Sequence, residues 1–352
     1  MISVILNSIL LLFVLINAFT MPKLAQSIAV SKSVAVHIPM RNEAKNVLEL
    51  VESLRSQNYA GQLHFYILDD NSTDQTYSLL QSATKDDPRF TLLVGSEPPN
   101  GWIGKTWALQ QIFEASSEEV IISLDADVRL TTDAITRGVS TLSEYKLNFL
   151  SVYPSQITTT FGERMIQPLL QWSWLSTLLL RFTMRSTRPA FAVANGQFFI
   201  VQRQVMTGYA NVKKEVLDDM ALARTLLASK FRGSVVNGGA IAQCQMYASF
   251  SELRSGYAKS LWKAFGSVIG SLIAIIFLFI SGVLPIILVL TGSPWGWIAL
   301  ELVVLSRIIS AYISDGAMMD SLLHPISSLL LIYLIIYSWS VRKSVQWKGR
   351  TL

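Results

Sequence analysis

Glu-Val-Ile-Ile-Ser-Leu-Asp-Ala-Asp, at residues 119–127, is an apolar run that ends in two carboxylates. Parallel strands that are buried on both faces contain such continuous Val, Ile and Leu runs, and ligands bind beyond their carboxyl ends. Asp125 and Asp127 do not suit an ordinary core, because an unpaired buried carboxylate is costly. Their spacing predicts a site for magnesium or manganese, which on oxygen ligands usually carries a diphosphate. A solvated turn with two acids is the alternative interpretation.

The polar middle of the chain, from about residue 31 to residue 264, alternates short β-rich runs with helical stretches. This pattern predicts an α/β fold with a mostly parallel sheet and helices on both faces. The expected strands cover residues 34–38, 63–68, 90–94, 120–124 and 149–153, and the expected helices cover residues 43–57, 73–83 and 106–115.

Polar residues follow the second expected strand, at residues 69–74. An Asx turn with Ser72 or Thr73 as the cap of the next helix would account for most of this segment. It does not account for Asp69 and Asp70, which makes these two acids candidates for a functional role.

Gly-Lys-Thr at residues 104–106 resembles part of a phosphate-binding loop. Pro99 stands where that motif requires its first glycine, so we do not predict a P-loop. Lys105 remains a candidate phosphate contact at the start of a helix.

Apolar residues are concentrated at the two ends of the chain. Of the 352 residues, 51% are hydrophobic and 15% are charged, which is too apolar for a wholly soluble protein. Residues 2–20 contain no charge and are long enough to span a bilayer. A secretory signal is the alternative, but no basic residue precedes Lys23 and no clear cleavage site follows. We therefore expect an uncleaved membrane anchor over residues 1–22.

Residues 265–341 are expected to form further transmembrane helices, at residues 267–292, 295–313 and 322–341. The middle segment is doubtful because it contains Glu301 and Arg307, and charges are expensive at bilayer depth.

Basic residues flank the expected spans, and residues 342–352 form a basic tail. Since basic residues favour the cytoplasmic side, an even number of crossings should follow residue 265. Either residues 295–313 do not cross, or residues 267–292, with Gly282 and Pro285 at their middle, form a hairpin. The expected location is the cell membrane, with the polar middle of the chain in the cytoplasm.

The charge pattern and the cysteine count narrow the range of partners. The net charge of +5 suits a membrane surface with anionic lipid. Nucleic acid is not an expected partner, because no basic run in the polar middle of the chain is interleaved with aromatic residues. Cys244 is the single cysteine, so the chain cannot form an intrachain disulfide or a cysteine-built zinc site.

Five segments, taken in order, resemble an inverting family 2 glycosyltransferase with a GT-A fold; they are residues 38–43, 69–74, 125–127, 195–199 and 217–223. Within that family the chain is similar to membrane-bound carotenoid and polyisoprenoid-lipid glycosyltransferases of the diaponeurosporenoate glucosyltransferase type. This second likeness depends on the flanking spans, residues 101–106, His324-Pro325 and residues 347–350.

The resemblance implies a UDP-sugar donor, with UDP-glucose as the first choice, a lipid acceptor and a manganese or magnesium ion. Asp127 would bind the metal and Asp219 would be the catalytic base. Asp218 and Asp219 could also be ordinary first-turn acids that the helix dipole favours. The implied substrate-binding residues are Pro39, Arg41, Glu43, Asp70, Lys105, Asp125, Gly196, Gln197 and Asp218.

One departure from the family bears on the product. Processive members carry a Gln-x-x-Arg-Trp motif after the base, whereas residues 251–262 contain Trp262 without that motif. We therefore expect one sugar per acceptor. The alternatives are transfer to a polyprenyl phosphate, and a non-catalytic membrane scaffold that keeps the fold. Residues 164–182 are expected to form a helix on the membrane surface, with a buried core helix as the alternative.

Overall fold

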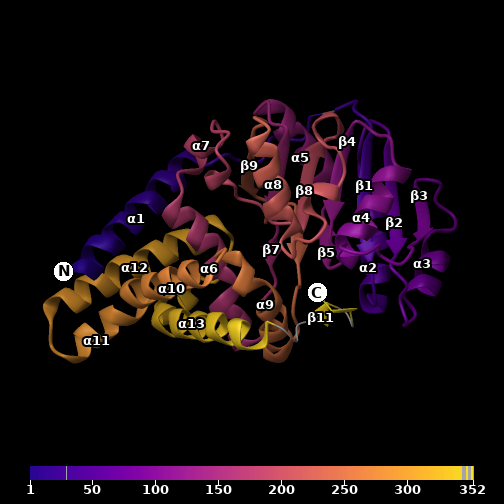
Figure 1. Ribbon diagram of the computed structural model, residues 1–352. Coiled ribbons are helices and arrows are strands. Elements are labelled where there is room, and N and C mark those ends of the chain that lie inside the picture. The colour runs from indigo at the N-terminus through magenta and orange to yellow at the C-terminus, as the bar shows by residue number, and fades with distance from the viewer. Residues whose placement is uncertain (29, 343–345, 348–349, 352) are drawn as a thin grey trace. The chain divides into compact units, whose positions relative to one another are not determined.

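The computed structural model describes residues 1–28, 30–342, 346–347 and 350–351, which divide into two units (Figure 1). The first, called the sheet unit, comprises residues 22–155 and 182–244. The second, called the helical unit, comprises residues 1–21, 156–181 and 245–352. The expected domain over residues 31–264 is thus divided between the two units.

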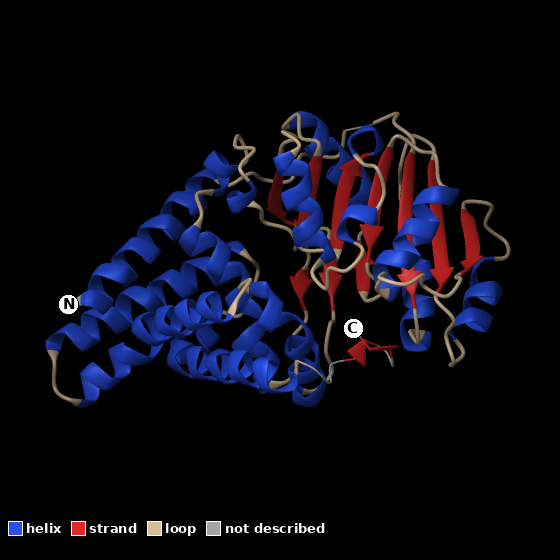
Figure 2. Ribbon diagram, viewed as in Figure 1, coloured by secondary structure: helices blue, strands red, loops and turns tan. Residues whose placement is uncertain are grey.

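Seven strands form the main sheet of the sheet unit, in the order β3-β2-β1-β4-β8-β6-β9 (Figure 2). Neighbouring strands are parallel except at β8, which is antiparallel to β4 and to β6. The mostly parallel sheet is therefore confirmed. The bounds are β1 Val34–Met40, β2 Leu63–Asp69, β3 Phe90–Val94, β4 Val120–Leu124, β6 Phe149–Tyr153, β8 Phe198–Gln202 and β9 Gly233–Asn237.

Short strands accompany this sheet. A three-stranded sheet has the order β5-β10-β7, with β5 at Val128–Leu130, β10 at Ala242–Cys244 and β7 at Ser155–Gln156. Near the carboxyl end of the chain, β11 (Gln346–Trp347) pairs with β12 (Arg350–Thr351). Residues 343–345, 348–349 and 352 of the expected basic tail lie outside the described residues.

Helices cover both faces of the main sheet, as expected. Phe199 and Val201 of β8 belong to one core cluster with residues of α4 and α8. Phe198 and Ile200 lie against Gly138 of α5. Successive side chains of a strand point to opposite faces, so α5 lies on the face away from α4 and α8. The helices of this unit are η1 Ala44–Asn46, α2 Val47–Arg55, α3 Thr76–Thr84, α4 Gly104–Ala115, α5 Ala134–Glu144, η2 Pro189–Phe191, η3 Arg203–Val205, η4 Ala210–Val212 and α8 Asp218–Ala228.

The expected cap of α3 is wrong. The helix begins at Thr76, whose amide and hydroxyl both donate to the Asp74 carboxylate. Ser72 and Thr73 instead bond to the loop that follows β1: the Ser72 hydroxyl accepts from the amide of Asn42, and the amide of Thr73 donates to the side chain of Asn42. Ser72 and Thr73 are therefore bonded to Asn42, from the loop after β1, and do not cap α3.

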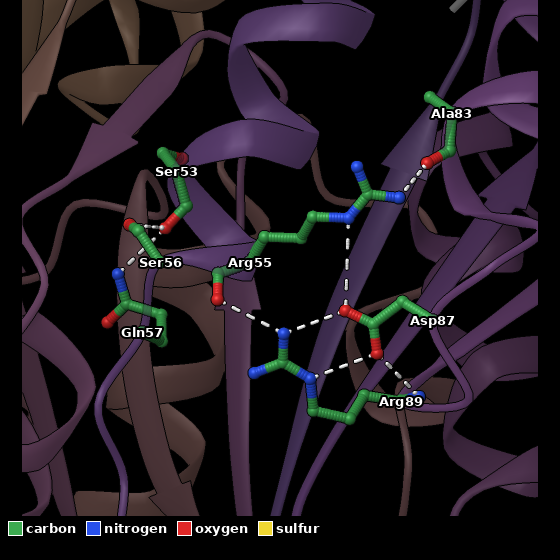
Figure 3. A network of polar contacts seen from close by, with 7 residues as sticks. All are labelled: Ser53, Arg55, Ser56, Gln57, Ala83, Asp87 and Arg89. Atoms are coloured by element: carbon green, nitrogen blue, oxygen red, sulfur yellow. Dashed lines mark hydrogen bonds and ion pairs between the residues drawn. The ribbon is translucent and has the colours of Figure 1, made fainter.

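A polar network joins α2 and α3 to the amino end of β3 (Figure 3). Asp87 accepts from Arg89 at 2.7 Å, Arg89 donates to the carbonyl of Arg55, and Arg55 donates to the carbonyl of Ala83. The hydrogen bond from Arg89 holds the pKa of Asp87 below its usual value. This network stabilises the edge of the sheet at which the parallel strands begin.

Four helices of the helical unit are long and apolar enough to cross a membrane: Ile2–Thr20, Val268–Leu290, Pro294–Ile313 and Met318–Val341. The elements are α1 Ile2–Thr20, α6 Phe161–Thr177, α9 Phe250–Ala264, α10 Val268–Leu278, the π-helix η5 Phe279–Val283, α11 Leu284–Leu290, α12 Pro294–Ile313, η6 Met318–Leu323 and α13 His324–Val341. α7 (Leu180–Thr183) lies where the chain passes from the helical unit to the sheet unit.

Residues 156–181 and 245–264 belong to the helical unit because their side chains and backbone bond to its helices. On α6, Trp172 is buried and donates from its indole nitrogen to Ser306 at 3.0 Å. On α9, the carbonyl of Ala258 and the amide of Trp262 both bond to the Ser338 hydroxyl. The apolar face of α6 is thus covered by protein, and its expected place on a membrane surface stays a prediction.

Of the two alternatives, the hairpin at residues 267–292 is wrong, because α10, η5 and α11 follow one another as a continuous helix. Pro285 has no N–H group, and the wider π-turn lets the helix pass this residue. Two carbonyls about one turn before Pro285 accept hydrogen bonds from side chains of α1. Ser3 donates to Ile280 at 2.7 Å, and Asn7 donates to Ser281 at 3.0 Å.

Residues 295–313 lie within a single helix, α12, that is long enough to span a membrane. Arg307 is buried, with its guanidinium 5.9 Å from the centre of the Trp172 ring, so this charge faces protein as expected for a charge at bilayer depth. Glu301 is exposed. Three candidate spans therefore follow residue 265, whereas the basic residues predict an even number of crossings.

Asn7→Leu should destabilise the helical unit by about 1–3 kcal/mol, because it leaves buried carbonyls without a donor. Ser8→Leu is the matched control, since Ser8 lies on the same helix and is exposed. Thermal unfolding of the full chain in detergent micelles measures the difference. Equal midpoints for the two variants would contradict the role given to Asn7.

Candidate active site

Four of the sequence motifs meet at one edge of the main sheet. Residues 39–43, 69–74 and 125–127 lie at or after the carboxyl ends of β1, β2 and β4. Residues 195–197 precede β8, and because β8 is antiparallel its amino end lies at the same edge. The strand order β2-β1-β4 reverses direction at β1, and ligands of open α/β sheets bind at such a switch point. This edge of the sheet, with the loops that surround it, is called the crevice.

The loops after β1 and β2 form one connected platform. Arg41 donates to the backbone oxygens of Asp70 and Asn71. The Asn42 side chain accepts from the amide of Thr73 at 2.8 Å. Asn42 and Asn71 have φ values of 52° and 53°, in the left-handed region that asparagine tolerates. Asp70 is buried at the base of this platform, with 1% of its surface exposed.

Two further predicted substrate-binding residues, Pro39 and Glu43, lie beside this platform. Pro39 is part of β1 and pairs with Leu68 of β2. Glu43 follows the strand, accepts from Asn46 and lies near enough to Asp127 for its charge to raise the pKa of that carboxyl.

Lys105 links two of the acids. Its amine lies 2.9 Å from Asp125 and 3.8 Å from Asp218. Burial alone would lower the pKa of Lys105, but these carboxylates outweigh burial and raise it. Tyr209 lies beside this group, bonded to the Ser123 hydroxyl of β4, and burial raises its pKa, as does the charge of Asp218. Lys105 is therefore a charged centre that neutralises part of the crevice.

Asp127 has a carboxylate that is only partly satisfied. Its Oδ1 atom is buried and has no hydrogen-bond partner within the described part of the chain. The carboxylate also shares a hydrogen bond with the thiol of Cys244. Burial raises the pKa of Asp127 to about 7, and the charges of Asp125 and Glu43 add to this effect.

This arrangement fits a hard divalent cation. A bare carboxylate oxygen among other acids is the donor such an ion prefers. The described residues contain no set of three or more His, Cys, Asp or Glu side chains placed to hold a metal. Magnesium and manganese do not need such a cage when substrate phosphates supply the remaining ligands.

Asp219 differs from its neighbour Asp218 in its surroundings. Burial raises its pKa to about 7, the charge of Asp218 adds to this, and Lys105 opposes it. One oxygen accepts from the amide of Met220 at 2.8 Å. A Cβ atom added to Gly196 would lie 3.3 Å from Cβ of Asp219, so the segment before β8 packs directly against this acid. Burial raises the pKa of Asp218 as well, but Lys105 opposes this effect from 3.8 Å away, and this pairing favours Asp219 as the proton acceptor.

The structure brings all of the predicted site residues to this edge of the sheet. The sequence analysis gave no place in the site to Ser123, Tyr209 and Cys244. They lie outside the five family segments and reach the crevice through strand pairing or loop packing. A buried position in β4 was a weak signal for Ser123, and the sequence contains no comparable signal for the other two.

Residues 35–208 match the family model described as "Glycosyl transferase family 2". This chain carries a family 2 glycosyltransferase domain. The match covers the main sheet from β1 through β8, together with the platform, Lys105, Asp125, Asp127, Gly196 and Gln197.

Three curated relatives are similar to parts or most of this chain. An N-acetylglucosaminyltransferase of Bradyrhizobium elkanii is 33% identical over 125 residues, which cover 34% of this chain and 65% of that protein. A 4,4'-diaponeurosporenoate glycosyltransferase of Staphylococcus aureus (strain Newman) is 25% identical over 344 residues, which cover 91% of this chain and 88% of that protein. A match to an N-acetylglucosaminyltransferase of Bradyrhizobium diazoefficiens spans 24% of that protein's length.

A solved structure supports the fold. The mannosyltransferase PcManGT from Pyrobaculum calidifontis, solved in complex with GDP-Man and Mn2+, superposes with a TM-score of 0.58 at 14% identity, over 97% of each chain. At this identity the likeness concerns the fold alone, and the GT-A fold that the sequence predicted is confirmed.

The raised pKa of Asp219 predicts a pH dependence for sugar transfer. A base must be unprotonated, so kcat/KM should fall as the pH drops through about 7. This fall is the acid limb of the pH profile. Asp218→Asn removes a charge that raises the pKa of Asp219, and should move the acid limb to lower pH. Lys105→Met removes a charge that lowers it, and should move the limb to higher pH. If the acid limb moved in the same direction in both variants, or did not move in either, its assignment to Asp219 would be contradicted.

Proposed function

We propose that this protein is a metal-dependent inverting glycosyltransferase that transfers one sugar from a UDP-sugar, UDP-glucose in the first place, to a lipid acceptor such as a carotenoid or related isoprenoid. The observation that carries the proposal is the pairing, in one crevice, of two different acids. Asp127 presents a bare buried oxygen, and Asp219 has the raised pKa of a proton acceptor.

The donor would lie along the crevice at the carboxyl ends of β1 and β4. Pro39, Arg41, Glu43 and the buried Asp70 would line the nucleotide pocket. Asp127 would hold the cation with support from Asp125, and Lys105 would face the diphosphate from the start of α4. When bound, the cation offsets the negative charge that develops on the departing diphosphate.

Asp219 would act on the acceptor. Its carboxylate takes the proton of the acceptor hydroxyl, the hydroxyl oxygen forms a bond to the anomeric carbon, and the bond from that carbon to the diphosphate oxygen breaks. Direct displacement inverts the anomeric configuration. Gly196 leaves room for Asp219, and the ion pair with Lys105 keeps Asp218 out of competition for the proton.

The acceptor is proposed to come from the membrane. Four helices of the described chain are long and apolar enough to cross a bilayer, and a relative that covers 91% of this chain is named as a glycosyltransferase of 4,4'-diaponeurosporenoate. We place the protein in the cell membrane with the sheet unit on the cytoplasmic side. Transfer to a polyprenyl phosphate remains the second enzymatic alternative. The paired acids of the crevice argue against a scaffold without activity.

Asp127→Ala should abolish cation-dependent binding of UDP and sugar transfer, because it removes the bare oxygen proposed to hold the ion. Calorimetry of UDP with manganese, and with EDTA in place of manganese, measures this dependence. Asp86→Ala, an exposed acid outside the crevice, is the control. Unchanged manganese-dependent binding in the Asp127 variant would refute the metal assignment.

Product analysis tests the base and the acceptor together. After expression and incubation with labelled UDP-sugars, mass spectrometry of extracted lipids should find an isoprenoid lipid that carries one sugar. Asp219→Asn should reduce this product by about 10²–10⁴-fold with little change in UDP-sugar affinity, since the base acts on the acceptor. Asp218→Asn should be milder.

Three outcomes would contradict this account. If the Asp218→Asn variant were inactive and the Asp219→Asn variant active, the catalytic base would be Asp218 and not Asp219. Label found only on polyprenyl phosphate would favour the alternative acceptor. Hydrolysis and transfer both absent from the wild-type chain would favour the scaffold.

A further inference from the structure

Cys244 is a buried residue of the crevice that neither the motifs nor the proposed reaction uses. It is the last residue of β10, which runs antiparallel to β5, and it lies opposite Val128. Val128 directly follows Asp127, so this pairing brings the thiol to the carboxylate.

The thiol contacts two segments of the site at once. It shares a hydrogen bond with the Asp127 carboxylate, and its sulfur accepts from the side-chain amide of Gln197 at 3.0 Å. A thiol has one proton to donate and a sulfur that accepts weakly, so both bonds can exist together. Gln197 in turn precedes β8, and its carbonyl accepts from the amide of Asp125.

We propose that Cys244 is a positioning residue for the cation site, where it holds one oxygen of Asp127 so that Oδ1 stays turned toward the cation and the diphosphate. This inference rests on the proposed function. A carboxylate can rotate about its terminal bond, and fixing one oxygen fixes the direction of the other. Partners that orient a ligand in this way commonly change metal affinity by about 10–100-fold when they are removed.

The chemistry of sulfur suits this position. A thiol is a weak donor, so it orients Asp127 while leaving most of the negative charge on the carboxylate for a cation. The bond from Gln197 holds the sulfur in place from the other side. Cys244 thereby connects the Asp125–Asp127 segment with the Asn195–Gln197 segment that packs against Asp219.

The hydrogen bond can be tested without any cation. Because the chain contains one cysteine, the infrared S–H stretching band of the full protein reports on Cys244 alone. The band should lie at the lower frequency of a hydrogen-bonded thiol, and Asp127→Ala should move it to higher frequency. Asp86→Ala should leave it unchanged. If the frequency of the S–H band is the same in Asp127→Ala as in the wild type, the proposal is overturned.

The functional consequence is tested by calorimetry of manganese at saturating UDP. Cys244→Ala should weaken manganese binding by about 10–100-fold and leave UDP binding in EDTA unchanged. Cys244→Ser, which keeps a donor, should recover most of the affinity. Wild-type affinity in Cys244→Ala overturns the inference alone. Equal weakening in both variants with equally lowered thermal stability also overturns it, because the role would then be packing. A wild-type chain without cation-dependent UDP binding contradicts the proposed function, and the inference falls with it.

Discussion

The crevice buries more negative than positive charge, and this imbalance determines how its residues behave. Asp125, Asp127, Asp218 and Asp219 share the region with Lys105, whose amine reaches Asp125 and Asp218. Burial without enough compensation raises the pKa of both Asp127 and Asp219 to about 7. Buried charges are normally paired, so a site with this deficit suits a divalent cation at one end and a proton transfer at the other.

The scaffold holds these acids by a few long-range contacts. The reversal of strand order at β1 opens the edge of the sheet, and the hydrogen bonds between the Arg41–Asn42 loop and the Asp70–Thr73 loop make one wall of it. β8 runs back beside β4 and places Gly196 against Asp219. In the helical unit, side chains of α1 donate to two carbonyls close to Pro285, which has no N–H group of its own. In each case a segment distant in the chain completes a local structure.

Much of the sheet unit could be predicted because its signals are local. The apolar runs that became β3, β4 and β6 have the expected bounds, and the motif residues lie where carboxyl ends of strands place them. The strands β5 and β10 have three residues each, too few for a pattern, and the role proposed for Cys244 depends on their pairing. A hairpin at Pro285 was one of two alternatives that the sequence left open. The helix is instead continuous, and Asn7, 274 residues away in the chain, donates to its carbonyl at Ser281.

The central claim is that the free oxygen of Asp127 binds the cation that holds the donor diphosphate. Crystals of the full chain grown with UDP and manganese, measured at the manganese absorption edge, test it most directly. The account predicts one strong anomalous peak within bonding distance of Asp127 Oδ1 and of the diphosphate. A peak on other side chains, or ordered UDP in the crevice with no peak beside Asp127, would contradict it.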